Sequence, residues 1–342
     1  MTDIIATDAP AKKDKLIRYS EIFGGNAGKS KNDGTDHDLL NGTFQGEGKY
    51  SGVPTAWVRF YGCNFSCLGY GQENLDDQST WKYPYKDFDT NSIKVVEELP
   101  VFAQTCDSAY SYESKFRKFA HKNTAAEIAQ KLIDLNKSAY NPLGLFEHER
   151  SKQETHMAFT GGEPMMNQRA IVDIMEEMHA LNKNSPVKVT VETNGTQELK
   201  EDFITFIEER FYRYEQVGGM MLPTRKASSE WFWSVSPKIR TSGEKWEDAI
   251  KPEVVAAYAA VSPHGQLKFV VDNDPRTWYE VEKAVKLYRE AGVDWDVWVM
   301  PVGANTEMQD SHAAAIAHEA MARGYNFAAR VHCFVFQNQV GT

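Results

Sequence analysis

Short apolar runs alternate with amphipathic segments along the chain from residue 55 onward. The runs are rich in β-branched and aromatic residues, which is typical of buried strands, whereas the segments between them repeat apolar positions at helical spacing. The pattern predicts strands at 55–61, 156–160, 187–193, 231–236, 267–272, 296–302 and 329–336. It predicts helices at 125–137, 168–182, 198–210, 252–260, 277–291 and 307–323, with Thr277 and Thr306 as helix N-caps.

Repeated strand–helix units predict a particular architecture. Each strand that returns to the sheet through a helix lies parallel to the strand before it, and the crossover is right-handed. Six or seven such units therefore predict an α/β fold, a partial or complete (βα) barrel with helices outside the sheet. In such a barrel the functional residues lie at the carboxyl ends of the strands.

The chain has 342 residues, a length compatible with two average domains or with one decorated barrel. Glycine- and asparagine-rich sequence at 24–42 is typical of a loop, so residues 1–42 are predicted to form an N-terminal arm followed by that loop. Polar stretches at about 68–105, 141–155 and 211–230 interrupt the units without resembling linkers. We therefore expect one barrel domain over 43–342 that carries these three insertions.

Composition excludes several classes of protein. With 42% hydrophobic and 25% charged residues, the chain is not collagen-like, coiled-coil or largely disordered. The net charge of −10 argues against a general affinity for the nucleic acid backbone, so no direct nucleic acid partner is expected. The sequence shows no run of 18 apolar residues and no secretory signal pattern, so we expect no membrane association and a cytoplasmic location.

Two motifs carry candidate chemistry. Cys63 and Cys67 form a C-x3-C pair just after the first predicted strand, and thiolates suit zinc and iron–sulfur centres. T-G-G-E-P at 160–164 follows the second predicted strand, and its adjacent glycines allow close approach of the backbone to a ligand. Each motif alone also has a plain structural explanation: separate reduced thiols in one case and a strand-to-helix turn in the other.

Together, the two motifs resemble those of the radical S-adenosylmethionine (SAM) enzymes. The third cluster ligand of that family normally lies three residues beyond the second cysteine, where this chain has Tyr70. Further motifs appear in the order found in the 7-carboxy-7-deazaguanine synthase family, and the likeness extends from about residue 19 to the end. These motifs are F-Q-G-E-G at 44–48, E-T-N-G-T at 192–196, S-P-K at 236–238, L-K-F-V-V at 267–271 and V-H at 331–332.

The same resemblance identifies the missing ligand. In that family the third cysteine is followed by Asp-Thr, and here Cys106 is followed by Asp107 and Ser108. The residues from Leu68 to Thr105 are then an insertion between the second and third ligands, which is tolerable because loop-closure entropy grows only logarithmically with loop length. Cys333, on the last predicted strand, is expected to be a packed thiol.

The resemblance also implies the cofactors and their ligands. Three thiolates would hold a [4Fe–4S] cluster and leave one iron for SAM. Ser108 matches the family's Mg²⁺ ligand and keeps the hydroxyl oxygen that such an ion prefers. The expected cofactor-binding residues are Gly161, Gly162, Glu163, Asn194, Ser236 and Lys238, and the expected metal ligands are Cys63, Cys67, Cys106 and Ser108.

Substrate residues follow in the same way. Arg59 matches a strand arginine that pairs with the substrate carboxylate, and a buried arginine in an apolar strand is costly unless it is paired. The other expected substrate residues are Gln45, Glu47, Thr160 and His332. The resemblance further implies a homodimer and an electron donor such as flavodoxin or ferredoxin.

The implied activity is a radical SAM lyase reaction that converts 6-carboxy-5,6,7,8-tetrahydropterin to 7-carboxy-7-deazaguanine by hydrogen abstraction, ring contraction and loss of ammonia. Two alternatives remain open. One is a radical SAM activase that generates a glycyl radical on a partner protein, which would share the C-x3-C loop. The other is a degenerate barrel that binds a ligand without catalysis, which the insertion in the cluster loop suggests.

Overall fold

The computed structural model describes residues 15–24, 43–181, 185–217, 220–225, 229–338 and 340. Most of the predicted N-terminal arm, the glycine-rich loop from residue 25 and the last two residues lie outside these ranges. The part of the predicted arm that is described is a strand, β1 (Ile17–Gly24), so the expectation of a loose arm is wrong there. Ile17 and Tyr19 are buried in the main core, whereas Phe23 stacks on Trp57 in a separate small cluster.

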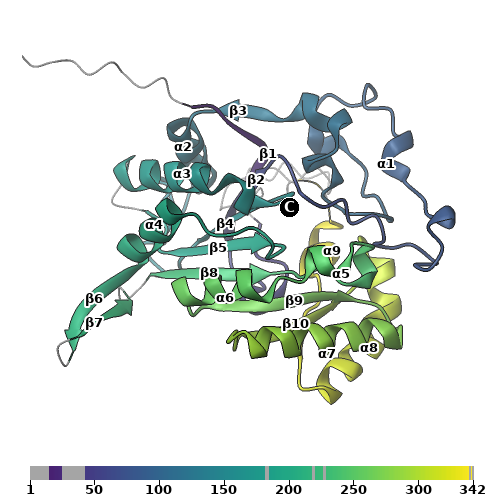
Figure 1. Cartoon of the computed structure of the whole chain (residues 1–342). Coiled ribbons are helices and arrows are strands. Elements are labelled where there is room, and N and C mark those ends of the chain that lie inside the picture. The colour runs from purple at the N-terminus through teal and green to yellow at the C-terminus, as the bar shows by residue number, and fades with distance from the viewer. Residues whose placement is uncertain are drawn as a thin grey trace, which may run out of the picture.

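One sheet of nine strands organises the described residues (Figure 1). Its order is β11-β10-β9-β8-β5-β4-β2-β1-β3. In this order the seven strands from β11 through to β2 pair in parallel with their neighbours. The strand β1 pairs antiparallel with both β2 and β3. The bounds are β2 (Thr55–Phe60), β3 (His121–Asn123), β4 (His156–Gly161), β5 (Lys188–Thr193), β8 (Glu230–Val235), β9 (Gly265–Val271), β10 (Asp296–Pro301) and β11 (Asn326–Phe327).

Helices connect the parallel strands and follow the sheet around from α2 to α8 (Figure 1). Helix α2 begins with a capping box, in which Thr124 accepts from the backbone of Glu127 and Glu127 reaches back to Thr124. The helix bounds are α1 (Pro84–Asp87), α2 (Ala125–Leu135), α3 (Gln168–Leu181), α4 (Glu201–Phe211), α5 (Trp246–Ala249), α6 (Pro252–Val261), α7 (Pro275–Glu290), α8 (Thr306–Ala322) and α9 (Val331–Phe336). A separate hairpin, β6 (Tyr212–Val217) and β7 (Met220–Arg225), lies between α4 and β8.

The predicted α/β class and the series of parallel strand–helix units are confirmed, with the sheet open between β11 and β3 in the described residues. The prediction of a strand at 329–336 is wrong, because residues 331–336 form α9. The segment is short and mostly apolar, so the spacing of its polar residues, Arg330 and His332, did not distinguish a strand from a helix. The predicted N-caps are also displaced, since Asp274 caps α7 and Asn305 caps α8.

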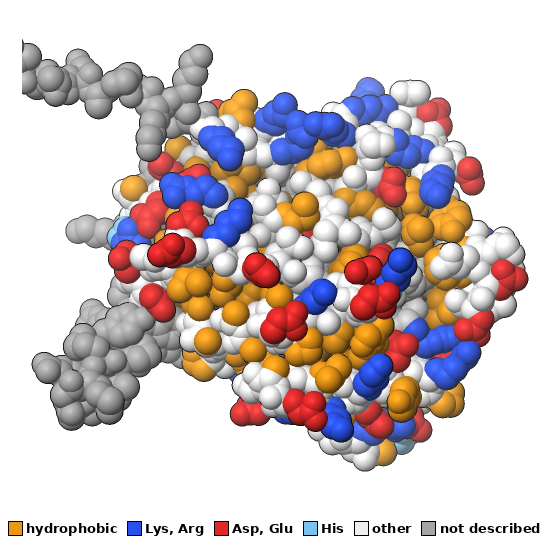
Figure 2. Space-filling view, viewed as in Figure 1, with side chains coloured by type: hydrophobic (Ala, Val, Ile, Leu, Met, Phe, Trp, Pro, Cys, Tyr) orange, Lys and Arg blue, Asp and Glu red, His pale blue; other side chains and the backbone are white. Residues whose placement is uncertain are grey.

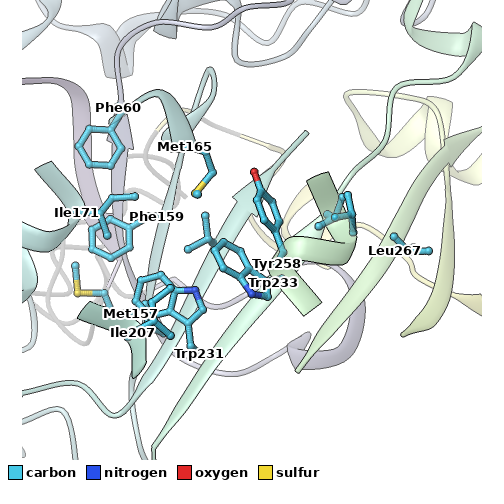
Figure 3. Packing of buried hydrophobic residues seen from close by; sticks show 14 of the residues in the cluster. Phe60, Met157, Phe159, Met165, Ile171, Ile207, Trp231, Trp233, Tyr258 and Leu267 are labelled. Atoms are coloured by element: carbon cyan, nitrogen blue, oxygen red, sulfur yellow. The ribbon is translucent and has the colours of Figure 1, made fainter. Parts of the chain in front are cut away.

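The main core lies between the parallel strands and the helices that cover them (Figure 3). Trp231 and Trp233 on β8 are fully buried, and Tyr258 of α6 stacks on Trp233 with ring centroids 4.5 Å apart. Phe203, Phe206 and Phe211 of α4 surround Trp231. Aromatic residues of this size bury large apolar areas, so this cluster fixes the centre of the sheet against α4 and α6.

The segment between β2 and β3 has little regular structure beyond short helices, and it has a small core of its own. Tyr85, Val96 and Leu99 of the predicted 68–105 insertion pack there with Tyr110 and Phe116. The segment is therefore packed onto the residues that follow Cys106.

The surface carries charges of both signs on the face shown in Figure 2, in keeping with a modest net charge of −10. Within the described ranges, no helix combines the length and the hydropathy required to cross a bilayer.

Truncation of Trp231 tests the packing of this core. Replacing Trp231 by Ala removes a fully buried ring, so we expect the free energy of unfolding to fall by about 3–5 kcal/mol. The measurement is urea denaturation followed by circular dichroism. Tyr279→Ala is the control, because Tyr279 is 67% exposed and its loss should change stability by no more than about 0.5 kcal/mol. Equal midpoints for the two variants would contradict this description of the core.

Candidate active site

A cavity of about 270 Å³ opens at the carboxyl ends of the parallel strands. Residues directly after β2, β4, β5 and β8 line it, and further lining residues come from β9, from the loop after β10 and from α9. This is the edge at which barrels of parallel strands position their functional residues. All the sequence-predicted site residues except Glu163 line this cavity: Gln45, Glu47, Arg59, Cys63, Cys67, Cys106, Ser108, Thr160, Gly161, Gly162, Asn194, Ser236, Lys238 and His332.

Three of the four cysteines meet in this cavity. Cys67 is buried in a small cluster with Phe65, and Cys63 and Cys106 pack against that cluster. Burial raises the pKa of Cys63 to about 12 and that of Cys106 to about 11, and it also raises the pKa of Cys67. Thiols in such surroundings become thiolates when a metal centre replaces the proton.

Cys333 lies apart from these three. It is fully buried in α9 and its thiol faces the carbonyl oxygen of Ala304 at 3.9 Å. The structure therefore places Cys333 as a packed thiol, as the sequence predicted, although in a helix and not in a strand.

Cys106 reaches the cavity because the two ends of the insertion meet. The backbone N–H of Thr105 donates to the carbonyl oxygen of Tyr70 at 2.7 Å, and a Cβ on Gly71 would lie 2.3 Å from the carbonyl oxygen of Ala103. The chain thus leaves the loop of Cys63 and Cys67 at Tyr70 and returns beside Tyr70 one residue before Cys106. Thr105 adopts φ of +73°, a left-handed conformation that costs free energy in a residue with a side chain.

The loop after β8 forms hydrogen bonds with the backbone of the loop that carries Cys63 and Cys67. Oε1 of Glu244 accepts hydrogen bonds from the backbone N–H groups of Ser66 and Cys67 at 2.9 and 2.6 Å. The N–H of Gly69 donates to the carbonyl oxygen of Ser242 at 2.9 Å. These bonds hold Cys67 at φ of +47°, another left-handed position.

The T-G-G-E-P turn packs directly on the same loop. Gly161 has φ of +148°, and a Cβ on Gly162 would lie 2.2 Å from the carbonyl oxygen of Gly62 and 2.6 Å from Cβ of Cys63. Only glycine permits this approach. The turn is thereby held against the first cysteine at the wall of the cavity.

Glu163 lies behind the turn, where it braces neighbouring strands. Its carboxylate accepts from the hydroxyl of Thr193 at 2.6 Å and from the backbone N–H groups of Asn194 and Met165 at 2.7 and 3.0 Å. Burial raises the pKa of Glu163, although these hydrogen bonds oppose that effect. The structure thus assigns Glu163 contacts that shape the ends of β4 and β5.

Lys238 supplies a positive charge next to the thiols. Its ammonium donates to the hydroxyl of Ser236 at 3.2 Å and lies 5.9 Å from the ring centroid of Tyr70. Burial lowers the pKa of Lys238, but Tyr70 and the cysteines outweigh burial and raise it. Lys238 therefore sits where negative charge on the cysteines or on a cluster would be stabilised.

Arg59 extends from β2 into the opposite part of the cavity. Its Nε donates to Glu21 on β1 at 2.9 Å, and its Nη1 donates to the hydroxyl of Ser108 at 3.0 Å. Thr160 is the register partner of Arg59 on β4, so both side chains face the same side of the sheet. The buried guanidinium therefore has a structural partner, Glu21, in addition to the substrate role expected from the sequence.

Glu47 belongs to a network of buried ion pairs that includes residues of β5 and β9. Lys268 on β9 donates to Glu47 at 2.7 Å and to Glu192 at 2.9 Å. Glu192 also accepts from the side-chain amide of Gln45 at 2.8 Å. Burial raises the pKa of Glu47, but the charges of Lys268 and Arg330 outweigh burial and hold it well below its ordinary value.

Arg330 joins this network to the segment after Cys106. Its Nε donates to Glu47 at 2.8 Å, and its Nη2 donates to Asp107 at 2.6 Å and lies 3.2 Å from Nε2 of His332. Burial, followed by the charge of Arg330, lowers the pKa of His332 to about 4. His332 is therefore a neutral ring near pH 7 and can accept or donate a hydrogen bond in the cavity.

The donor chemistry of the three thiols that line the cavity suits an iron–sulfur cluster. Among the described residues, no three His, Cys, Asp or Glu side chains are grouped to hold one metal ion. A cluster takes its thiolates on different iron atoms, so its ligands stand further apart around a shared space. Three thiols around one cavity, with Lys238 as counter-charge, match that requirement.

Several charged residues of the site were missed by the sequence analysis. Lys268 lies inside the apolar strand L-K-F-V-V, so the argument that singled out Arg59 applied to it equally. The other missed residues also stood within quoted or neighbouring motifs: Asp107, Glu192 and Arg330. Glu21 had no comparable signal, because its pairing with Arg59 depends on the alignment of β1 with β2.

Comparison with known proteins finds curated proteins of similar sequence. No family model matches the chain. A curated 7-carboxy-7-deazaguanine synthase from Halobacterium salinarum is 26% identical over 296 residues, which cover 85% of this chain and 86% of that protein. The chain is similar to the 7-carboxy-7-deazaguanine synthases. The resemblance expected from the motifs is thereby confirmed.

Other similarities are shorter or weaker. The 7-carboxy-7-deazaguanine synthase of Bacillus subtilis is 23% identical over 172 residues, which are 50% of this chain and 47% of that protein. Among solved structures, QueE from Escherichia coli aligns with a TM-score of 0.45 and 14% identity over 93% of this chain and 95% of that chain.

Replacement of the displaced cysteine tests the cluster site. In Cys106→Ala, two thiols remain around the cavity, so we expect the protein to lose most of the iron and the broad visible absorption of a [4Fe–4S] cluster after anaerobic reconstitution. Cys333→Ala is the matched control, because Cys333 is packed in α9. An unchanged iron content in Cys106→Ala would contradict the assignment.

A relocation of the ligand tests the meeting of the two insertion ends. Because Tyr70 lies beside Cys106, the double variant Tyr70→Cys, Cys106→Ala should regain part of the iron that Cys106→Ala loses. Iron analysis and the visible spectrum provide the measurement. No recovery in a double variant that folds like the wild type would show that the two positions are not spatially equivalent.

Proposed function

We propose that this chain is a 7-carboxy-7-deazaguanine synthase that uses a [4Fe–4S] cluster and SAM. The observation that carries this proposal is the meeting of three thiols and the Gly161-Gly162 turn with a buried, carboxylate-binding arginine in one cavity. When bound, the cluster and SAM supply a radical that removes a hydrogen atom from the substrate. The substrate is 6-carboxy-5,6,7,8-tetrahydropterin, which then contracts its ring and loses ammonia.

The residues divide between the two ends of the cavity. Cys63, Cys67 and Cys106 hold the cluster, and the open backbone of Gly161 and Gly162 receives the methionine end of SAM. Asn194, Ser236 and Lys238 contribute polar contacts to the same cofactor, whereas Glu163 acts from behind by fixing the backbone of Asn194.

The other end binds the pterin. Arg59 offers a planar pair of donors to the substrate carboxylate, since its described contacts use two of its five N–H groups. Gln45, Glu47, Thr160 and His332 surround the ring with donors and acceptors. Hydrogen bonds join Gln45 to Glu192, Glu47 to Lys268 and His332 to Arg330. These three side chains are thus fixed before the substrate arrives, which lowers the cost of ordering them on binding.

The proposal also includes an electron donor and a second copy of the chain, which follow from the family resemblance and not from the cavity. A cluster that must be reduced by one electron before it can cleave SAM needs a one-electron donor such as flavodoxin or ferredoxin. We also propose a homodimer in the cytoplasm, on the basis of the family resemblance. Mg²⁺ is left out of the site, because Ser108, the side chain offered to it, accepts a hydrogen bond from Arg59, and the neighbouring Asp107 accepts one from Arg330.

Product identity tests the function. Anaerobically reconstituted protein, given the pterin, SAM and a reductant, should form 7-carboxy-7-deazaguanine, which mass spectrometry identifies. Arg59→Gln should raise the KM for the pterin by about 100-fold, because a charge-assisted contact to the carboxylate is lost. SAM cleavage without any deazaguanine product would contradict the proposal and favour an activase, and an iron content near zero would favour a barrel that only binds.

A further inference from the structure

Arg59 donates to Ser108, the residue that the family resemblance offers to a divalent cation, and Arg330 donates to the neighbouring Asp107. We propose that the guanidinium groups of Arg59 and Arg330 provide, in this chain, the positive charge that relatives would draw from Mg²⁺, so that the substrate carboxylate binds without a metal ion. This inference rests on the proposed function, because it concerns the carboxylate of the same substrate.

The hydroxyl of Ser108 already has two partners. It accepts from Nη1 of Arg59 at 3.0 Å and donates to Oδ1 of Asp107 at 3.3 Å. A Mg²⁺ ion requires close oxygen ligands in octahedral geometry, at roughly 2.0–2.1 Å. An ion on this oxygen would lie beside a guanidinium, and two positive charges at that separation repel each other strongly in a buried site.

Asp107 is likewise occupied. Its Oδ2 accepts from Nη2 of Arg330 at 2.6 Å, while Nε and Nη1 of Arg330 hold Glu47 and the carbonyl oxygen of Gly303, both at 2.8 Å. The Arg330 side chain is 11% exposed, and each of its three nitrogens has a partner. It is therefore fixed in place as a permanent cation beside Asp107.

The geometry suits a carboxylate. Arg59 and Arg330 both line the cavity, and they are joined through Ser108 and Asp107. Arg59 keeps three N–H groups beyond its two described contacts, and its planar fork matches the two oxygens of a carboxylate, whereas Arg330, whose nitrogens have partners, contributes its charge. Glu21 and Glu47 balance the charges of the two arginines, so the pair stays buried without an unpaired charge before the substrate enters.

Metal binding gives a test that does not depend on turnover. Mn²⁺ is a probe for Mg²⁺ sites, and its EPR spectrum distinguishes the hydrated ion from a protein-bound ion. With the oxidised holoenzyme and the pterin present, we expect Mn²⁺ to remain hydrated in the wild type. A protein-bound signal in the wild type that disappears in Ser108→Ala would overturn the proposal.

The rate of product formation without added metal ion is the second test. After treatment with EDTA and removal of the chelator, the holoenzyme should form product at the same rate with and without added Mg²⁺. Product that appears only with Mg²⁺ would overturn this inference and leave the proposed function intact. The absence of product under both conditions would contradict the proposed function.

Variants of Arg330 locate the effect. Arg330→Gln should weaken pterin binding by about 100-fold, measured by equilibrium dialysis, whereas Arg330→Lys should weaken it less because the positive charge remains. Arg323→Gln is the matched control, because this substitution removes the same charge at the end of α8. Arg323 pairs there with Glu282 and Glu319. Equal binding by Arg330→Gln and Arg323→Gln, with matched melting temperatures, would contradict the role of Arg330.

Discussion

The hydrogen bond from the N–H of Thr105 to the carbonyl oxygen of Tyr70 closes the insertion and brings Cys106 into the cavity. A long excursion of the chain costs little additional closure entropy once its ends are fixed. The excursion's own core, around Tyr85 and Leu99, then packs on the residues that follow Cys106. The third thiol therefore owes its place to a tertiary contact, whereas Cys63 and Cys67 owe theirs to a short loop after β2.

A second constraint is the balance of buried charge. The cavity combines Arg59, Lys268 and Arg330 with Glu21, Glu47, Glu192 and Asp107, and each cation has at least one carboxylate within 2.9 Å. Removal of Glu21 would leave the charge of Arg59 without a carboxylate partner in a region of low dielectric. Such a network is rigid before ligands bind, and this rigidity is what lets a small polar ring be held in one orientation.

The sequence predicted most of the fold, because alternating periods of strands and helices leave a clear pattern. It failed where the period was ambiguous, as in the apolar run of 331–336 that forms α9. It also missed β1, whose place depends on pairing with β2 across a long separation in sequence. For the site, the motifs predicted which residues meet, but not the ion pairs between them, since contacts such as Arg59 with Glu21 follow from tertiary register.

The central claim is that Cys63, Cys67 and Cys106 hold one cluster and leave one iron without a protein ligand. Mössbauer spectroscopy of protein reconstituted with ⁵⁷Fe tests this most directly. The account predicts one [4Fe–4S] cluster per chain, with a single iron site whose parameters change when SAM is added. Four equivalent iron sites that ignore SAM, or a two-iron cluster, would contradict it.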